Sequence, residues 1–195
     1  MVNPLSHDFG GIHVTETADL VISISNTGTS DLTVSGTLVE GDGYSCDFLG
    51  ELIVAPGGSQ DMVITFNPDT YIEYPGSVII SSNDPYNRDV TVDLTGLGMS
   101  QDIELSTEAL DFGKVVYGQS TPLTFDIVNL GNYDLTVNNI SVDGDDFAVD
   151  FSGSFVVGAE SQYTMTATYT ANTFDAATGL ITIYTDDPLD PEVTV

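Results

Sequence analysis

Apolar residues occupy every second position in short runs along the whole chain. Leu20, Ile22 and Ile24 form one such run, and Met62 and Ile64 belong to another. Because successive side chains of a β-strand point to opposite faces of the sheet, this spacing predicts strands that bury one face. Glycine, asparagine, aspartate and proline separate the runs, which is typical of turns between short strands. The pattern therefore predicts an all-β fold.

The same succession of runs and turns occurs twice, at an offset of 103 residues. Asp8 aligns with Asp111 (111 − 8 = 103), and Asn26 aligns with Asn129, with no gap between these matches. The second copy keeps the phase of the apolar positions, which matters because a slip of one residue would turn every inward side chain outward. About seven strands per copy, each with one buried face, predict two tandem immunoglobulin-like, antiparallel β-sandwiches.

The repeat also predicts where each module begins and ends. We expect the first module to cover residues 1–98 and the second residues 99–195, joined by a short connection without a flexible tether. Val195 aligns with Val92, so the final strand of the second module is predicted to be incomplete. Two explanations stay open: the parent chain continues, or a neighbouring subunit donates the missing strand.

Two aligned glycines follow the aligned asparagines. Gly28 and Gly131 each lie two residues after Asn26 or Asn129. Glycine is favoured where the backbone needs a positive φ or approaches another segment closely. We expect one of these two situations at both positions.

The charge of the chain restricts its partners. With 30 acidic and 2 basic residues, the formal net charge is −28. Binding to nucleic acid or to anionic lipid needs a basic surface, so neither partner is expected. No apolar run approaches the roughly 20 residues that a membrane-spanning helix needs, so we expect no membrane insertion by this segment. The first residues lack the basic and apolar regions of a signal peptide, and any secretion signal is expected outside this chain.

The order of the motifs in each copy is distinctive. In the first copy it runs from Phe9 through residues 26–28, 32–34 and 83–85 to a closing stretch at 90–98. This order resembles the ASH/hydin-like immunoglobulin-fold repeats, and most of all the bacterial type found in "choice-of-anchor D" surface proteins. The resemblance implies a secreted or surface-displayed array whose modules act as spacers or adhesive units.

Residues for catalysis are scarce. The histidines are His7 and His13, and neither has a histidine counterpart in the second copy. A hydrolase needs a nucleophile beside a base, so the chain is not expected to be an enzyme, and both histidines are interpreted as exposed surface residues. Cys46 aligns with Val149, which favours a buried, inert thiol. An intermolecular disulfide stays open as the alternative for this cysteine.

Acidic turns supply the candidate metal site. Asp143, Asp145 and Asp146 lie in one turn, and Asp186 and Asp187 in another. Calcium prefers six to eight oxygen ligands from carboxylates and carbonyls, which such turns could provide. Neither turn has the ligand spacing of an EF-hand, and the alternatives are a solvated acidic surface and an Asx-type turn before the last strand. Calcium is the one cofactor that the sequence suggests.

Three functions are compatible with these observations. The first is a non-enzymatic structural or spacer module pair of a longer acidic, extracellular or cell-surface repeat protein. The second is an adhesin-type module that binds a surface protein or a glycan, which an aromatic cluster on one face would favour. The third is a fibre subunit that assembles through strand donation. The expected partners are neighbouring Ig-like modules of the same chain or of other subunits.

Overall fold

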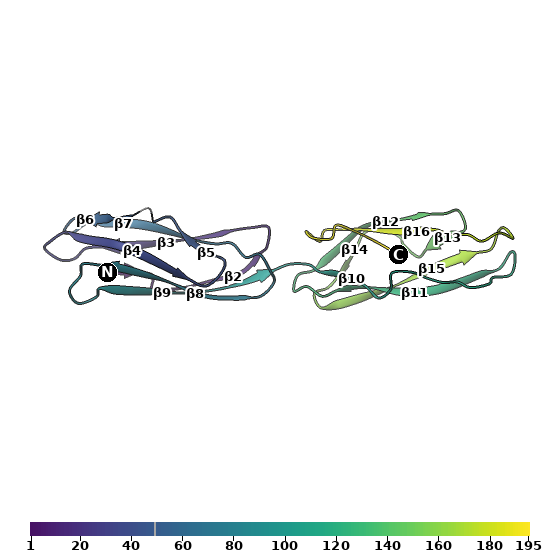
Figure 1. The fold of residues 1–195 in the computed structure, drawn as a ribbon, viewed down its shortest axis with the longest axis horizontal. Helices are drawn as coiled ribbons and strands as arrows, with labels where there is room; N and C mark the ends of the chain where they lie inside the picture. The colour runs from purple at the N-terminus through teal and green to yellow at the C-terminus, as the bar shows by residue number, and fades with distance from the viewer. Residues whose placement is uncertain (49) are drawn as a thin grey trace. The chain divides into compact units, whose positions relative to one another are not determined.

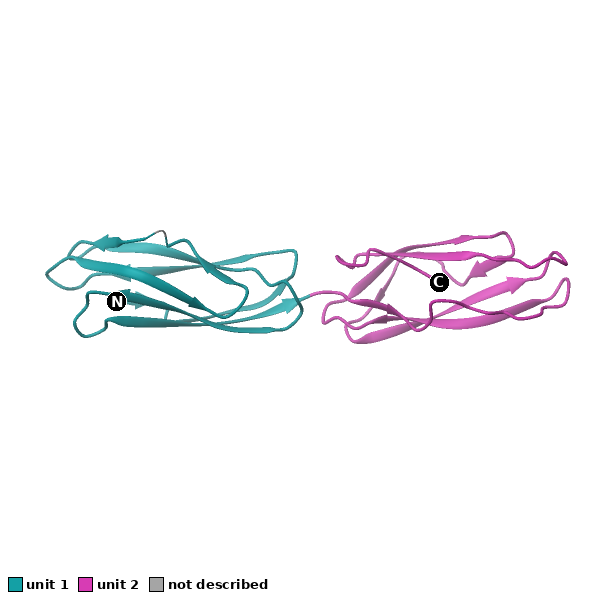
Figure 2. Ribbon diagram, in the orientation of Figure 1, with its two compact units in different colours: residues 1–99 teal, residues 100–195 magenta. Residues whose placement is uncertain are grey.

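The chain forms two compact units, each built only from strands and connections. The computed structural model describes residues 1–48 and 50–195, and these residues contain no helix. The units are Met1–Met99 and Ser100–Val195 (Figure 2), so the division falls one residue beyond the expected one. Within each unit the strands form two layers (Figure 1). The predicted all-β architecture of two Ig-like sandwiches is confirmed.

Unit 1 contains a four-stranded and a five-stranded sheet. The first has the order β1-β3-β7-β5 and the second β2-β9-β8-β4-β6. The strands within the described residues are β1 (Val2–Asn3), β2 (Ser6–His13), β3 (Ala18–Ser25), β4 (Leu32–Glu40), β5 (Tyr44–Cys46), β6 (Leu52–Val54), β7 (Ser59–Phe66), β8 (Glu73–Ser82) and β9 (Asp89–Met99).

Unit 2 contains two four-stranded sheets. Their orders are β10-β11-β15-β13 and β14-β12-β16-β17. The strands within the described residues are β10 (Ile103–Leu105), β11 (Ser120–Asn129), β12 (Leu135–Asp143), β13 (Phe147–Val149), β14 (Phe155–Val157), β15 (Ser161–Thr170), β16 (Leu180–Thr185) and β17 (Glu192–Thr194). Several strands in both units are only two or three residues long, too short to show an alternating pattern.

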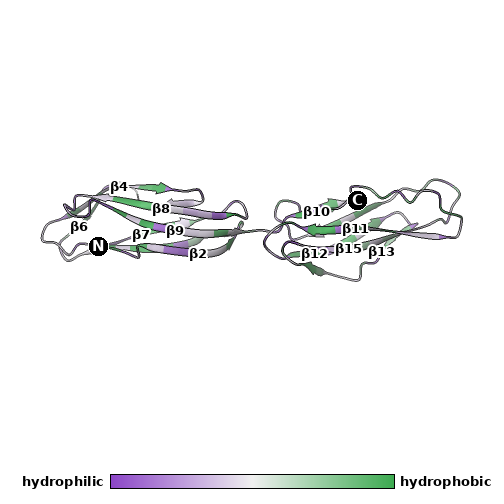
Figure 3. Cartoon of the chain, turned by 90° about the horizontal axis from the view of Figure 1, so that it is seen from below, coloured by the Kyte–Doolittle hydropathy of each residue, from purple (hydrophilic) through white to green (hydrophobic). Residues whose placement is uncertain are grey.

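Each unit has its own hydrophobic core between its two sheets. In unit 1, Ile22 of β3 and Ile64 of β7 belong to this core and are fully buried. In unit 2 their counterparts Phe125 and Ala167 are buried at the same register positions of β11 and β15. The hydropathy colouring in Figure 3 shows hydrophobic and hydrophilic residues along the same strands. The predicted phase of the inward positions therefore holds in both units.

One strand pair is parallel, which corrects the expectation of purely antiparallel sheets. β2 pairs with β9 in parallel from Ser6 opposite Asp93 to His13 opposite Met99, whereas the other strand pairs within the described residues are antiparallel. Apolar alternation identifies a strand but carries no direction. A parallel pair needs only a long connection between its strands, and here the rest of the unit provides it.

The structure also bears on the membrane. No helix within the described part of the chain has the length and apolar character to cross a bilayer.

Candidate functional site

The turn before the last strand of each unit is built on an aspartate. In unit 1, Asp84 Oδ1 accepts hydrogen bonds from the backbone N–H groups of Tyr86 at 2.8 Å and Asn87 at 3.1 Å. These bonds stabilise the carboxylate and hold the pKa of Asp84 below its usual value. The bond from Tyr86 has the larger effect, followed by the bond from Asn87. The Asx-type turn suggested by the sequence is thus present.

The counterpart in unit 2 is more deeply placed. Asp187 is 2% exposed, and its Oδ1 accepts from the N–H groups of Leu189 at 2.8 Å and Asp190 at 3.1 Å. Its Oδ2 accepts from the N–H of Ile103 at 2.8 Å, which ties the turn to β10. Asp186 is exposed, and its Oδ1 accepts from the N–H of Thr136 at 2.7 Å. Backbone donors therefore occupy three of the four carboxylate oxygens.

The other acidic turn, residues 143–146, lies at the end of β12 opposite to the end that Asp186 contacts. Thr136 is near the start of β12, whereas Asp143 ends it, seven residues or roughly 24 Å further along. The structure therefore does not bring the two sets of calcium candidates together. Asp143 and Asp145 are exposed, and Asp146 Oδ1 accepts from Asn172 Nδ2 at 2.9 Å. Among residues 1–48 and 50–195, no group of three or more His, Cys, Asp or Glu side chains could hold a metal ion.

The histidines are less exposed than the sequence suggested. His7 and His13 are both half-buried. The ring of His7 meets Phe9 edge-on with centroids 4.6 Å apart, and His13 Nδ1 lies 2.8 Å from Thr15 Oγ1. Both histidines belong to β2, where alternate side chains turn toward the core. Their expected exposure is therefore wrong, because β2 pairs with β9 in the sheet and neighbouring side chains partly cover both rings.

Cys46 differs from its prediction in a similar way. It is a free thiol at the end of β5 and is half-buried rather than fully buried. Its Sγ lies 3.4 Å from Thr37 Oγ1, and the side chain packs against the core of unit 1. The short strand β5 lies at the edge of its sheet, which leaves the side chain partly open.

The asparagines in the Asn-x-Gly motifs have a role that the sequence did not reveal. Asn129 is 0% exposed, and its Nδ2 donates to the carbonyls of Tyr133 at 2.8 Å and of Val157 at 3.2 Å. Its Oδ1 accepts from the N–H of Gly131 at 3.1 Å. Asn26 makes the equivalent bonds in unit 1, to Ser30, Val54 and Gly28. Each amide thus joins the turn that follows it to the end of another strand, β6 in unit 1 and β14 in unit 2.

Gly28 and Gly131 were expected to have a positive φ or a close approach of other backbone, and they differ in this respect. A side chain at Gly131 would collide with the backbone of Ser100 and Gln101, so the predicted close approach is present there. At Gly28 the nearest atom to such a side chain is Asn26 Oδ1 at 3.2 Å, and φ is not positive at either glycine. The positive-φ alternative is wrong, because the asparagine side chain closes the turn in place of a left-handed backbone.

Unit 2 contains a groove at the position where β9 lies between β2 and β8 in unit 1, here called the unit 2 groove. Its volume is about 640 Å³, and its lining includes residues 109–115, residues 173–181 and Val195. The side chains of Phe112, Phe147 and Tyr169 lie along it. Neither 109–116 nor 176–179 belongs to a strand, although their counterparts in unit 1, residues 6–13 and 73–76, lie in β2 and β8.

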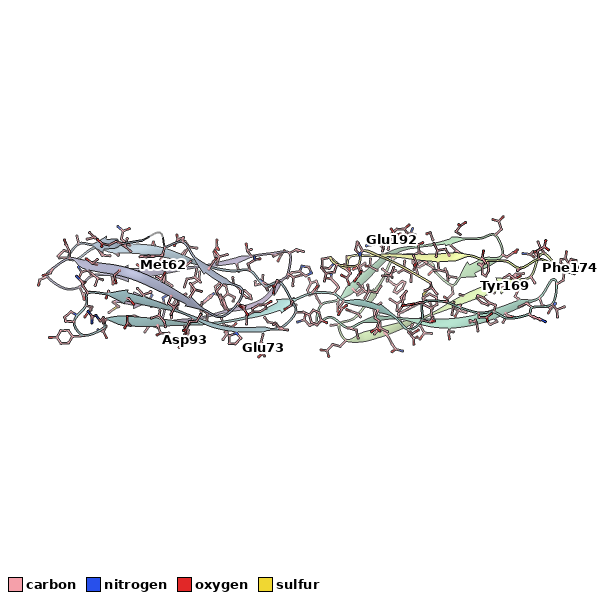
Figure 4. The ribbon with its side chains drawn as sticks, in the orientation of Figure 1. Met62, Glu73, Asp93, Tyr169, Phe174 and Glu192 are labelled. Carbon is pink, nitrogen blue, oxygen red and sulfur yellow. The ribbon has the colours of Figure 1, made fainter. Side chains whose placement is uncertain are left out.

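The groove has an exposed aromatic pair beside it. The rings of Tyr117 and Phe174 stack with centroids 4.8 Å apart and an interplanar angle of 15°. Tyr117 is 57% and Phe174 89% exposed, and Figure 4 shows Phe174 in the connection that follows β15.

Solved structures with related folds are distant. A protein of unknown function from Porphyromonas gingivalis W83 is 15% identical with a TM-score of 0.42, over 100% of this chain and 96% of that one. The ASH/PapD-like domain 7 of human CEP192 is 17% identical with a TM-score of 0.41, over 51% of this chain and 84% of that one. The secreted serine protease VesC from Vibrio cholerae is 15% identical with a TM-score of 0.39; 92% of this chain matches about half (49%) of the protease.

The family assignment comes from the sequence of each unit. A search among curated proteins finds no significant match. The profile of the HYDIN/CFA65/VesB-like, Ig-like domain matches residues 1–96 and again residues 101–195. These two matches coincide closely with the two structural units. The chain therefore belongs to the HYDIN/CFA65/VesB-like Ig-like domain family and contains two copies of that domain.

Proposed function

We propose that the module pair is a non-enzymatic structural spacer in a longer extracellular or cell-surface repeat protein, of the "choice-of-anchor D" type. The observation that carries the proposal is that the same module occurs twice, each copy with a hydrophobic core of its own. Every buried side-chain N or O atom in the described residues has a hydrogen-bond partner. Modules that each have their own hydrophobic core can extend a chain without packing against one another for stability.

The side chains available for chemistry support the same proposal. His7 and His13 pack against Phe9 and Thr15 within the edge strand β2. The carboxylates of the turns that recur in both units accept backbone N–H groups, so they hold loops in place and are not directed at a substrate. A charge of −28 suits an extracellular surface on which modules must stay soluble and repel each other.

An exchange experiment tests the spacer role. The pair is displayed between a cell anchor and a reporter binding domain, and capture of reporter ligand on an opposing surface is measured. Replacement of the pair by an unrelated two-module sandwich of the same length should leave capture unchanged, because a spacer contributes only reach. Deletion of the pair should reduce capture. If the length-matched replacement also loses capture, the pair contributes recognition and the spacer proposal is wrong.

A second candidate function, ligand binding as an adhesin module, is favoured by the stacked pair of Tyr117 and Phe174. Exposed aromatic faces provide contact area for the apolar face of a sugar ring or for a protein surface. Binding of the chain to glycan and surface-protein panels is compared with that of Phe174→Ala and of Tyr86→Ala. Tyr86 is 92% exposed in unit 1 and serves as the matched control. A binding signal lost only in Phe174→Ala supports this function, and the absence of any signal counts against it.

A further inference from the structure

Unit 1 has a surface hollow with an entirely polar lining, here called the unit 1 hollow. It lies where the start of β4 meets the turn between β8 and β9, and its volume is about 430 Å³. The lining includes the hydroxyls of Thr33, Ser35 and Ser81 and the charged groups of Arg88 and Asp89. Such a lining suits a ligand that presents many hydrogen-bonding groups and little apolar surface.

The backbone around the hollow is held by hydrogen bonds between β4 and the turn. Asn83 Oδ1 accepts from the N–H of Thr33, and the N–H of Asn83 donates to the carbonyl of Thr33, both at 3.0 Å. Across the turn, the N–H of Ser82 donates to the carbonyl of Arg88 at 2.7 Å. The register of β4 against β8 shifts at Ser35, an extra residue that is exposed. The hollow is therefore preformed, and a ligand does not have to order it.

The side chains of the hollow offer both donors and acceptors. Arg88 is exposed, and its guanidinium brings five N–H donors to the lining. Ser81 Oγ donates to Asp89 Oδ1 at 2.6 Å, which holds the carboxylate in place and leaves Oδ2 to accept from a ligand. Ser35 Oγ donates to the carbonyl of Ser81 at 3.3 Å, so its oxygen serves as a further acceptor. Because the charges of Arg88 and Asp89 cancel, the lining has no net charge.

Unit 2 has the same backbone arrangement at the equivalent place. Its strand β12 has a register shift between Val137 and Asn139, as β4 has between Val34 and Gly36. Asp186 Oδ1 accepts from the N–H of Thr136 at 2.7 Å, and the N–H of Asp186 donates to the carbonyl of Thr136 at 3.1 Å. The bulge and the clamped turn are thus features of the module rather than of one copy.

The side chains at this place differ between the two units. Tyr184 stands at the position of Ser81, and Pro191 at that of Arg88. A phenol ring fills space that the serine leaves open, and proline has no donor to replace the guanidinium. The hollow therefore depends on the side chains of unit 1 and is not required by the fold.

We propose that the unit 1 hollow binds a neutral sugar through its hydroxyl groups. Each sugar hydroxyl is both donor and acceptor, so one can accept from the guanidinium of Arg88 while its neighbour donates to Asp89 Oδ2. An apolar ligand would leave these groups without partners. An acidic sugar fits less well, because the lining has no excess positive charge and a chain of charge −28 repels anions. The site is independent of the spacer role and separate from the pair of Tyr117 and Phe174.

The test uses the whole chain and four free sugars: glucose, galactose, mannose and N-acetylglucosamine. Amide NMR shifts are recorded as each sugar is added at rising millimolar concentration. Residues 33–35, 81–83 and 88–89 should shift in a saturable way with at least one sugar, and the equivalent residues 136–138, 184–186 and 191–192 should not. Absence of saturable shifts with all four sugars, or equal shifts in both units, would overturn the proposal. Tighter binding of glucuronate than of glucose would show that the site prefers anions, which contradicts the assignment to a neutral sugar.

Variants with matched controls test the individual contacts. Ser81→Tyr copies unit 2 and should weaken sugar binding at least roughly tenfold, because the ring fills the hollow. Ser45→Tyr makes the same change at an exposed position of β5 and should not weaken binding. Arg88→Gln should weaken binding, whereas Lys114→Gln, which removes the other cation of the chain, should not.

These variants also separate binding from folding. Arg88 is exposed, so its replacement leaves the core of unit 1 intact, and the amide spectrum of residues outside the hollow checks this directly. Unchanged sugar affinity in Arg88→Gln or in a folded Ser81→Tyr would overturn the proposal. Equal loss of affinity in Lys114→Gln would do so as well, because it would indicate a general effect of charge. Failure of the proposal would leave the spacer role untouched, since the capture experiment does not involve a sugar.

Discussion

At the scale of single residues, the buried asparagines show how one side chain organises an end of each module. A carboxamide has two donor hydrogens and an acceptor oxygen, so Asn129 can bind carbonyls on two segments and also accept from the N–H of Gly131 in its own turn. An aspartate has the same shape but no donor hydrogen. An apolar side chain would leave all three backbone groups without partners inside the protein, which is costly.

Replacing Asn129 by alanine should therefore destabilise unit 2. The expected loss is about 2–4 kcal/mol in the free energy of unfolding, since several buried backbone groups lose their partner at once. Hydrogen exchange of unit 2 amides measures this loss, with Asn138→Ala as the control because Asn138 is exposed on β12. Asn129→Asp should also destabilise the unit. If Asn129→Ala and Asn138→Ala have the same stability, the amide does not have the role argued here.

Tyr44 makes the stability of unit 1 sensitive to alkaline pH. Burial, and secondarily the negative charge of Asp8, raise the pKa of Tyr44 from 10.0 to about 12. Its hydroxyl donates to the carbonyl of Tyr74 at 2.7 Å, a bond that the phenolate cannot make. The folded pKa is higher than the unfolded one, so this contribution is complete below pH 10 and is lost as pH rises toward 12.

The measurement is the free energy of unfolding of the chain and of Tyr44→Phe at several alkaline pH values. The difference between them should be constant below pH 10 and shrink as the pH approaches 12, because the other tyrosines titrate in both proteins. A difference that does not change with pH would show that Tyr44 is ionised equally easily in the folded and unfolded chain.

At the scale of strands, the sequence predicts most of the long elements and misses the short ones. Leu20, Ile22 and Ile24 place β3 and its buried face correctly, because alternation over eight residues defines both a strand and its orientation. β5 and β14 have three residues each, and such segments carry no period. The direction of β2 was missed because it depends on a partner, β9, distant in the sequence.

The candidate site was harder to predict from the sequence than the strands, because it depends more on tertiary contacts. Residues 109–116 align with the β2 sequence of unit 1 but belong to no strand, and the alignment alone could not reveal this difference. A strand forms there only when a partner supplies the hydrogen bonds. The roles of Asn129 and Asp187 likewise depend on backbone groups brought from other segments.

The glycines of β9 test the packing of this strand directly. Gly96 faces the Phe66 ring, so Gly96→Ala should destabilise unit 1 by about 1–3 kcal/mol through overpacking. Gly36 in β4 has no atom within 4 Å of an added side-chain carbon and has no positive φ, so Gly36→Ala should be neutral or slightly stabilising. Denaturant unfolding of both variants provides the comparison. Equal effects would mean that the Phe66 ring moves away at no cost.

At the scale of the whole molecule, the dominant property is the charge of −28 on 20.7 kDa. Two cations, Arg88 and Lys114, can neutralise little of it. Carboxylates such as Asp84 and Asp187 are held by backbone N–H groups, which stabilises each turn locally. The remaining exposed carboxylates repel each other more strongly in the folded state, where they are closer together. Folding therefore proceeds against a repulsion that the solvent can screen.

The stability of the chain should consequently rise with salt. The Debye length falls from about 30 Å at 0.01 M to about 10 Å at 0.1 M ionic strength, which is enough to screen repulsion across a module. Thermal unfolding in low salt, in sodium chloride and in calcium chloride of matched ionic strength separates screening from specific binding. We expect a higher midpoint in both salts and little difference between them, because the acidic turns at 143–146 and 186–187 lie at opposite ends of β12.

The two turns can be examined individually in the same experiment. A larger increase in calcium that disappears in Asp145→Asn with Asp146→Asn, but persists in Asp61→Asn on β7, would identify a true calcium site at the 143–146 turn. Equal midpoints at all salt concentrations would contradict the argument from repulsion. That result would require the 30 acidic side chains to be no closer together in the folded chain than in the unfolded one.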